Sequence, residues 1–360
     1  MIKVFEAFAG YGSQRMALRN IGIDFEVVGI SEIDGDVIRS YAAIHSDFLK
    51  KIECIDEFTP EREEMISYLE KINAPLDYRT FENKARKLRL NKLKEMYLAN
   101  KLIKNYGDIR KINPKVLPDF DLFTYSFPCQ DISVAGYQCG LDKNSGTRSS
   151  LLWDCCKIIE TKKPKYLLME NVKNLVGKKH KGNFLKFLDY LKDLEYNNSW
   201  KVLNARDYGI PQNRERVFCI SQLNGEEFIF PEPVELKLKL YDMLESNVDE
   251  KFYLKRNQLT DTPITQEYSY CLDANYWKGT TLESFLKKHR RQLVTDKVNA
   301  DGKYIARRLT PKETWRLMGV SDDDFKKASQ VVSNTSLYRQ SGNSIVVQVL
   351  EAIFRQIFNK

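Results

Sequence analysis

The sequence predicts an α/β protein built around a doubly wound mixed sheet, with a smaller second domain nearer the carboxyl end. The apolar stretch 3–8 indicates a buried strand, and Gly10 and Gly12 separate it from a helical stretch at 14–20. A strand, a glycine turn and a helix in this order are typical of the nucleotide-binding entry to such a sheet, although an ordinary tight turn gives the same short pattern. Apolar and helical segments alternate up to Pro231, beyond which no sustained period is found.

Composition and charge exclude several classes of protein. The chain has 360 residues, 42% of them hydrophobic, which is enough for a large core. Its net charge of +8 suits an anionic partner such as nucleic acid, or simply a solvated basic surface. Seven cysteines without a CxxC pair, and only three histidines, argue for reduced thiols and no metal site. No bilayer-spanning apolar run occurs and no signal peptide precedes Val4, so we expect a cytoplasmic protein without membrane association.

A second predicted strand, at 26–30, ends in a short acidic segment. Glu32 follows the glycine turn by about twenty positions, where dinucleotide-binding sheets place a carboxylate that binds a ribose. The alternative is a carboxylate that stabilises the start of a helix. The glycine turn and Glu32 together favour a nucleotide-type cofactor.

The segment 54–106 differs from its surroundings because it is dense in Lys, Arg and Glu, with apolar residues at helical spacing. It predicts two or three amphipathic helices inserted into the sheet domain. Within it, 84–94 carries an excess of basic residues. A contact with DNA phosphates is one interpretation, but a solvated helix face is favoured.

A candidate nucleophile follows the next predicted strand, 120–123. The strand leads through Pro128 to Cys129, so the thiol stands where a loop begins. A thiolate at the carboxyl end of such a strand is a candidate nucleophile, whereas a lone cysteine is more often a small buried hydrophobe. The aperiodic loop 134–149 comes directly afterwards, and we expect it to act as a lid over a substrate.

Further polar side chains follow other predicted strands. After a helix at 151–161, the strand 166–169 ends in Glu170, which is expected to share a crevice with Cys129. Arg214 and Arg216 stand two positions apart just before a strand at 217–220. Side chains two apart on an extended chain point the same way, so both are expected to face the same site. Surface ion pairing is the alternative.

The segment 231–307 predicts a small domain with a basic and aromatic face, including the basic run 287–291. A helix start follows, with Thr310 as its cap, Pro311 in its first turn and Glu313 three residues after the cap.

Six motifs in this order resemble the DNA (cytosine-5) methyltransferases of bacterial restriction–modification systems, over nearly the whole chain. They are FEAFAGYGS, SFPCQDIS, MENVKNL, QNRERVF, RRLTPKETWRLMG and RQSGNSIVV. The family often has an aromatic residue where Ile33 stands, and many members lack the 54–106 insertion. A subgroup with a similar insertion includes CG-specific enzymes, but 271–279 does not look like theirs, so that specificity is not carried over.

The resemblance implies an S-adenosylmethionine-dependent methyltransferase fold. It implies a catalytic domain at 1–230 with the 54–106 insertion, a target-recognition domain at 231–306, and a segment at 307–360 that returns to the catalytic domain.

The resemblance also implies residue roles. Cys129 would attack carbon 6 of cytosine, which makes carbon 5 enamine-like, while Glu170 would act at ring nitrogen 3, protonated there as burial would favour. Arg216 would hold the base carbonyl, and Arg214 and Asn171 would set the Cys129 loop. The implied S-adenosylmethionine contacts are Phe8, Gly10, Gly12, Ser13, Glu32, Ile33, Asp108, Ile109, Pro128, Leu151, Asn343 and Ile345, with Glu32 on the ribose and Asp108 on the adenine amine. The implied DNA contacts are Gln130, Ser133, Arg148, Tyr276 and Lys278.

The implied partner is double-stranded DNA, from which the target cytosine is flipped out. The resemblance further implies a monomer, a separately acting restriction endonuclease, and no metal; it does not identify the base that removes the carbon 5 proton. Two alternatives stay open. One is a tRNA-modifying enzyme of the same superfamily, which the presence of 231–307 disfavours. The other is a non-catalytic DNA-binding protein, which the retained motif residues disfavour.

Overall fold

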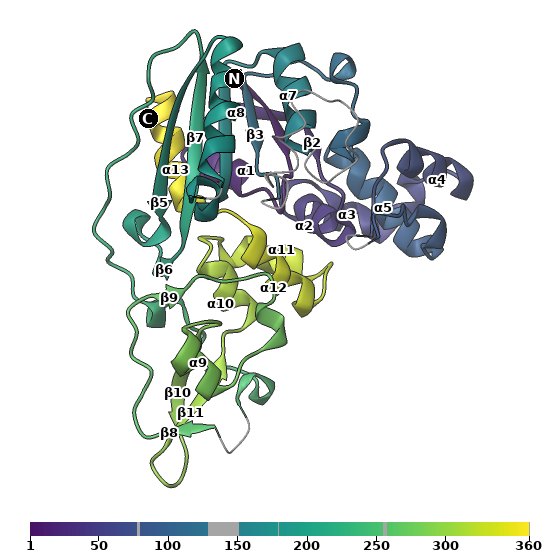
Figure 1. Cartoon of the computed structure of the whole chain (residues 1–360). Coiled ribbons are helices and arrows are strands. Elements are labelled where there is room, and N and C mark those ends of the chain that lie inside the picture. Colours follow the sequence, from purple (N-terminus) through teal and green to yellow (C-terminus); the bar gives the residue numbers. More distant parts are fainter. Residues whose placement is uncertain (78–79, 129–150, 179, 255–257, 360) are drawn as a thin grey trace. The chain divides into compact units, whose positions relative to one another are not determined.

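The computed structural model describes residues 1–77, 80–128, 151–178, 180–254 and 258–359. The chain folds into two compact units, which are described separately (Figure 1). The first comprises Met1–Leu203, Arg216–Pro231 and Ile353–Lys360, and the second comprises Asn204–Glu215 and Glu232–Ala352.

The first unit is built on a six-stranded sheet of order β2-β1-β3-β4-β7-β5. Strands β2, β1, β3 and β4 are parallel, and β7 runs antiparallel to β4. The strands are β1 (Ile2–Ala7), β2 (Phe25–Ser31), β3 (Leu122–Tyr125), β4 (Tyr166–Val172), β5 (Tyr196–Asn204) and β7 (Glu215–Leu223). The strand order changes direction between β1 and β3, and ligands bind outside the carboxyl ends of strands at such a point. The predicted doubly wound mixed sheet is confirmed.

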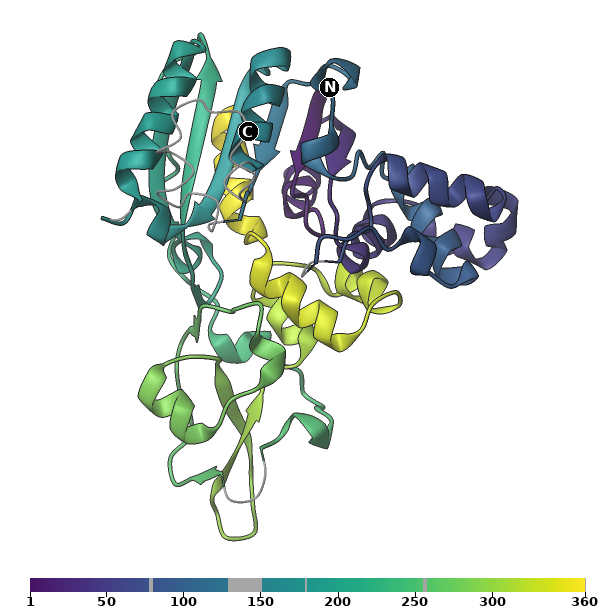
Figure 2. The ribbon, with the colours of Figure 1, turned by 45° about the vertical axis from the view of Figure 1, so that its right-hand side comes forward.

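Side-chain alternation along the strands decides which helices cover which face. Phe5 joins a buried apolar cluster with residues of α7 and α8, so these helices lie on one face. Its neighbour Glu6 points to the other face and accepts a 2.5 Å hydrogen bond from the Tyr41 hydroxyl of α2. Phe358 of α13 packs edge-on against Tyr166 of β4. Figure 2 shows the end of α13, in yellow, beside the strands of the sheet. The helices that belong wholly or partly to this unit are α1 (Ser13–Asn20), α2 (Gly35–His45), α3 (Phe48–Lys51), α4 (Arg62–Lys71), α5 (Leu90–Leu102), α7 (Leu151–Lys162), α8 (Lys181–Asp193) and α13 (Val347–Phe358).

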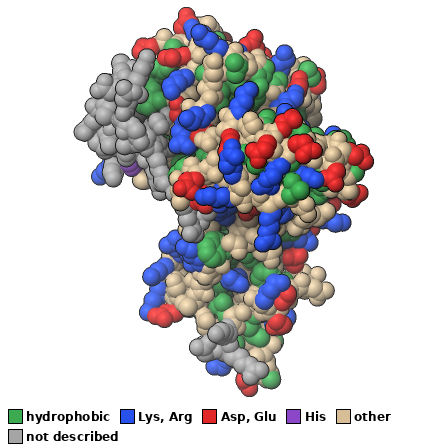
Figure 3. All heavy atoms as spheres, turned by 90° about the vertical axis from the view of Figure 1, so that its right-hand side faces the viewer, with side chains coloured by type: hydrophobic (Ala, Val, Ile, Leu, Met, Phe, Trp, Pro, Cys, Tyr) green, Lys and Arg blue, Asp and Glu red, His purple; other side chains and the backbone are tan. Residues whose placement is uncertain are grey.

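The predicted insertion contains α4 and α5 and returns to the sheet beside β2, where Asn105 bridges to Ile30. Five basic residues of its 84–94 stretch are paired with carboxylates. The pairs are Lys84–Asp77, Arg86–Glu70, Lys87–Glu82, Lys92–Glu95 and Lys94–Asp56. Figure 3 shows Lys and Arg interspersed with Asp and Glu on the face that carries these helices. This charge pattern favours the solvated helix face over a phosphate-binding surface.

The second unit contains elements that the aperiodic sequence after Pro231 did not reveal. Its strands are β6 (Gln212–Asn213), β8 (Leu259–Thr260), β9 (Ser269–Tyr270), β10 (Leu293–Val298) and β11 (Tyr304–Arg308), arranged as the sheets β10-β11-β8 and β6-β9. Its helices are α9 (Leu282–Lys288), α10 (Pro311–Arg316), α11 (Asp322–Ser329) and α12 (Asn334–Asn343), and α13 begins in it. The predicted start of α10 is confirmed, because Thr310 and Glu313 cap it reciprocally.

Candidate active site

Three of the residues predicted for catalysis, Glu170, Asn171 and Arg216, stand at the ends of strands in the first unit. β3 ends at Tyr125, and the chain continues through Phe127 to Pro128, whose side chain is exposed. The predicted nucleophile Cys129, the predicted lid 134–149 and the DNA-contact candidates Gln130, Ser133 and Arg148 lie outside the described residues.

Glu170 and Arg216 form an ion pair across β4 and β7. In the antiparallel register Val172 stands opposite Arg216, and Glu170 shares the face of Val172 because side chains two apart on a strand point the same way. The Nε atom of Arg216 lies 3.3 Å from Oε1 of Glu170. Glu170 is only 7% exposed, so Arg216 pairs with a largely desolvated carboxylate at the end of the strand.

Asn171 connects the end of β4 to the segment that leads to Cys129. Its Nδ2 donates to the carbonyl of Phe127 at 2.9 Å, and its Oδ1 accepts from the amide of Val172 at 2.9 Å. Both functional ends of the amide are therefore used, which fixes its orientation. A buried amide held in this way fixes the main chain two residues before Cys129.

Arg214 has different surroundings from Arg216, although the two are only two residues apart. It belongs to the second unit and is 3% exposed. Its guanidinium donates to the carbonyls of Leu272 (2.9 Å), Gly342 (3.0 Å) and Ser344 (2.6 Å). Arg214 thus fixes the main chain on both sides of Asn343, a function that its alternation with Arg216 did not suggest.

The glycine turn after β1 has the backbone that a close ligand approach requires. Gly10 and Gly12 have φ values of 57° and 86°, and even Phe8 adopts 55°, a region that glycine enters without steric cost. A Cβ at Gly12 would lie 2.4 Å from Nε2 of His45. Ser13, which is buried, begins α1 directly afterwards.

Glu32 joins the glycine turn to the end of β2. Its Oε2 accepts from the amide of Gly10 at 3.1 Å, and its Oε1 accepts from the amides of Ile33 (2.7 Å) and Asp34 (2.9 Å). Burial raises the pKa of Glu32 to about 7, against the lowering effect of these hydrogen bonds. The structure thereby brings the two predicted cofactor segments together.

The Asp108 carboxylate accepts hydrogen bonds from two side chains of the protein. It accepts from Nε and Nη2 of Arg110, at 2.9 and 2.7 Å, and from Nδ2 of Asn73 at 2.8 Å. Ile109 beside it is buried and Leu151 is half-buried. In the second unit Asn343 is exposed and Ile345 is buried.

Glycines with left-handed backbone beside a largely buried carboxylate fit a nucleoside cofactor. The turn leaves no room for a Cβ at Gly12, and Glu32 provides an acceptor of the kind that ribose hydroxyls require.

Among the described residues, no cluster of three or more His, Cys, Asp or Glu side chains is placed to bind a metal. No helix in the described part of the chain is both long and apolar enough to cross a bilayer.

The two described residues predicted to contact DNA in the second unit differ in exposure. Tyr276 is 2% exposed, and its hydroxyl donates to the carbonyl of Gln292 and accepts from the amide of Leu309. A side chain so enclosed belongs to the core of the second unit, and its contact with DNA stays a prediction. Lys278 is exposed as expected, and its Nζ lies 5.5 Å from the ring of Trp277, itself 39% exposed and not identified from the sequence.

Sequence reasoning also missed Asn105, which holds the main chain of Glu32. Its Oδ1 accepts from the amide of Glu32 at 3.1 Å and its Nδ2 donates to the carbonyl of Glu32 at 2.9 Å. Only its position shortly before Asp108 hinted at a role, because a single asparagine at the end of a charged segment has no distinctive pattern.

The mixed sheet with its antiparallel β7 defines a methyltransferase fold of the α/β class. It matches the solved structures of S. pombe Dnmt2 methyltransferase (TM-score 0.66, 18% identity, 100% of this chain and 99% of that one) and of a Spodoptera frugiperda DNMT2 mutant (TM-score 0.66, 19% identity, 99% and 100%). The chain belongs to the family described as C-5 cytosine-specific DNA methylase, whose model matches residues 60–359.

Two relatives cover almost the whole chain. The Type II methyltransferase M2.ScrFI of Lactococcus lactis subsp. cremoris is 67% identical over 359 residues, which cover 99% of each chain. The orphan methyltransferase M.SssI of Spiroplasma monobiae is 36% identical over 390 aligned positions, covering 99% of this chain and 97% of the relative. The predicted family and the predicted enzyme class, a DNA cytosine-5 methyltransferase, are therefore confirmed.

Proposed function

We propose that this DNA cytosine-5 methyltransferase modifies cytosine within a specific short duplex sequence, through a covalent adduct on Cys129 and with S-adenosylmethionine as cofactor. The observation that carries the proposal is the arrangement at the ends of β4 and β7. There the Glu170–Arg216 pair lies beside Asn171, whose amide holds the carbonyl of Phe127.

The residues at this edge have complementary tasks in the proposed reaction. The Cys129 thiolate adds to carbon 6, which breaks the ring's aromaticity and makes carbon 5 nucleophilic. The carboxyl group of Glu170 donates a proton to ring nitrogen 3 and so stabilises the charge that develops there, and Arg216 holds both Glu170 and the base carbonyl. Once carbon 5 has taken up the methyl group of the cofactor, loss of the carbon 5 proton to a base expels the Cys129 thiolate and restores the aromatic ring, and the proton on nitrogen 3 returns to Glu170.

The proposed cofactor site is the carboxyl edge around β1 and β2. Glu32 would accept from the ribose hydroxyls and Asp108 from the adenine amine, while Phe8 and the glycine turn would approach the nucleoside closely. When bound, S-adenosylmethionine supplies an activated methyl group. Asn343 and Ile345 stay proposed cofactor contacts by resemblance, and within the second unit Arg214 fixes the main chain on both sides of Asn343 through its hydrogen bonds to the carbonyls of Gly342 and Ser344.

The proposed domain roles follow the same division of labour. Residues 1–230 would form the catalytic domain and 231–306 the target-recognition domain, with 307–360 returning to the catalytic domain. The exposed Lys278 remains a proposed DNA contact in the recognition segment. The similarity to the Type II methyltransferase M2.ScrFI supports a role in protecting host DNA from a separate restriction endonuclease.

Bisulfite sequencing of plasmid DNA from cells that express the protein tests this proposal. We expect cytosines in one short sequence to resist deamination with the wild type and none to do so with Cys129→Ser, because a serine hydroxyl is a far weaker nucleophile at carbon 6. Gel-shift measurements should show that Cys129→Ser still binds the same duplex. Unprotected DNA from cells that contain soluble wild-type protein would overturn the proposal, and methyl incorporation into tRNA instead would identify the substrate as RNA.

A further inference from the structure

The helical insertion at 54–106 contacts the proposed cofactor residues at two places, the segment 72–76 and Asn105. We propose that its segment 72–76 forms part of the wall of that site, and that Asn73 is a positioning residue that orients the Asp108 carboxylate for the adenine amine. The inference rests on the proposed cofactor and gives the insertion a task within cofactor binding.

The main chain of the insertion is attached to two predicted cofactor contacts. The amide of Asp108 donates to the carbonyl of Ile72 at 3.0 Å, and the amide of Leu76 donates to the carbonyl of Ile33 at 2.9 Å. A Cβ at Gly107 would lie 1.9 Å from the oxygen of Ile72, so this approach depends on the glycine. The segment 72–76 is therefore held against Ile33 on one side and Asp108 on the other.

The side chain of Asn73 points at the Asp108 carboxylate in a fixed orientation. Its Nδ2 donates to Oδ2 of Asp108 at 2.8 Å, and its Oδ1 accepts from Nδ2 of Asn83 at 3.4 Å. Because Asn83 also donates to the carbonyl of Leu69 at 3.2 Å, its amide is itself anchored. This chain of contacts decides which end of the Asn73 amide faces Asp108.

Asp108 also accepts from Arg110, but the two donors differ. The Arg110 side chain is 38% exposed, and a long exposed side chain exchanges its partners at little cost. An adenine amine that approaches Asp108 therefore takes an acceptor position now used by Arg110. Asn73, fixed from within the insertion, keeps the carboxylate in place during that exchange.

The carboxyl end of the insertion fixes the second proposed cofactor carboxylate. Asn105 brackets the main chain of Glu32 through its donor and its acceptor, and its Nδ2 also donates to Oδ1 of Asn100 in α5 at 2.7 Å. One inserted segment thus braces the carboxylates proposed for the adenine and for the ribose.

The variant Asn73→Gly tests the inference with little backbone disturbance. Asn73 has a φ of 51°, which glycine adopts freely, so the change removes the amide and keeps the turn. Asn224, exposed at a φ of 49° after β7, provides the matched control Asn224→Gly. Binding of S-adenosylhomocysteine and of its 6-oxo analogue, which lacks the adenine amine, would be measured by calorimetry for the wild type and both variants.

We expect Asn73→Gly to bind S-adenosylhomocysteine about tenfold more weakly, the effect of losing the orientation of one charge-assisted hydrogen bond. Its affinity for the 6-oxo analogue and for duplex DNA should be unchanged, as should both ligand affinities of Asn224→Gly. A wild-type affinity in Asn73→Gly, or an equal loss for the two ligands, would overturn the inference alone. Wild-type protein that binds no S-adenosylhomocysteine would overturn the proposed cofactor and this inference together.

Discussion

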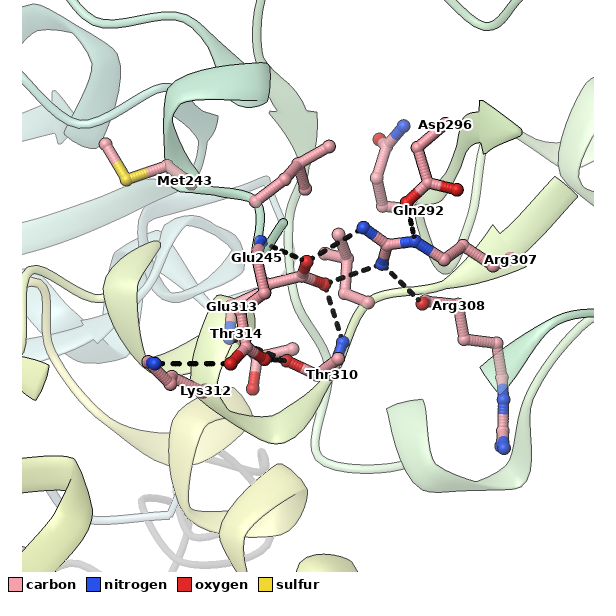
Figure 4. A network of polar contacts seen from close by, with 12 residues as sticks. Met243, Glu245, Gln292, Asp296, Arg307, Arg308, Thr310, Lys312, Glu313 and Thr314 are labelled. Carbon is pink, nitrogen blue, oxygen red and sulfur yellow. Dashed lines mark hydrogen bonds and ion pairs between the residues drawn. The ribbon is translucent and has the colours of Figure 1, made fainter. Parts of the chain in front are cut away.

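Each of the two units contains a buried Glu–Arg pair, and the two pairs differ in how completely they are enclosed. At the strand ends of the first unit, Arg216 and Glu170 meet at 3.3 Å with side-chain exposures of 16% and 9%. In the second unit, Arg307 and Glu313 have no exposed side-chain surface and meet through two parallel hydrogen bonds of 2.8 and 2.9 Å (Figure 4).

The surroundings of Glu313 explain the difference. Its carboxylate also accepts from the amides of Thr310 (2.7 Å) and Glu245 (2.8 Å), while Arg307 donates in addition to Asp296 and to the carbonyl of Arg308. The pair links β11 to the start of α10 and satisfies every polar group it buries, as a structural pair must. The Glu170–Arg216 pair instead keeps some exposed surface at a strand end, which its proposed role in catalysis requires.

The largest effect is expected from breaking the enclosed pair. Glu313→Gln keeps an acceptor for the cap of α10 but takes from the Arg307 guanidinium its fully buried carboxylate and leaves it only the partly exposed Asp296. We expect the free energy of unfolding to fall by about 3–5 kcal/mol, measured by urea denaturation.

The double variant Arg307→Met with Glu313→Gln is the control, because it also removes the positive charge of Arg307. It should recover a substantial part of the lost stability. If the single and double variants were equally stable, Arg307 would not be the reason for the loss.

At the strand-end pair, the same substitution should affect catalysis and spare folding. We expect Glu170→Gln to lower the methylation rate by about 10²–10³-fold, or about 3–4 kcal/mol of barrier, because the amide cannot donate an acidic proton to the base. Its urea midpoint should match that of the wild type. A rate within threefold of wild type would remove Glu170 from the proposed chemistry.

Glu6 is a third buried carboxylate, and it differs from Glu170 and Glu313 because its hydrogen bond comes from the Tyr41 hydroxyl and not from an arginine. Burial raises the pKa of Glu6 from 4.5 to about 7, opposed by Tyr41 and by the charge of Arg15. With the folded pKa above the unfolded one, its contribution to stability is complete below pH 4.5 and is lost as the pH rises to 7. Relative to Glu6→Gln, the wild type should therefore lose about 3 kcal/mol of unfolding free energy across this interval. Parallel pH profiles for the two proteins would contradict the raised pKa.

The sequence predicted best where a motif coincides with a strand end. Glu32 follows β2, and Glu170 and Asn171 stand among the last three residues of β4. The sheet brings them to its carboxyl edge because parallel strands end there together. The sequence was a poorer guide to the surroundings of a residue where only the spacing of side chains or the local composition was available. Arg214 and Arg216 look equivalent in sequence, yet the chain passes from one unit to the other between them.

The second unit shows the same limit through Tyr276. An aromatic residue in a basic, polar segment suggests a nucleic-acid contact, but its ring is buried and its hydroxyl bonds Gln292 and Leu309, which come from distant parts of the segment. Short strands and tight turns bury residues without any period that a sequence window would detect.

The sequence by itself determined the class of sheet, the family and the identity of the motif residues, because apolar period, glycine placement and motif order are local properties of the chain. The tertiary structure alone decided the partners of those residues. The contact of Asn73 with Asp108 spans 35 positions, that of Asn105 with Glu32 spans 73, and that of Arg214 with Ser344 spans 130. Hydrogen bonds over such separations depend on how the whole chain packs, and no local pattern encodes them.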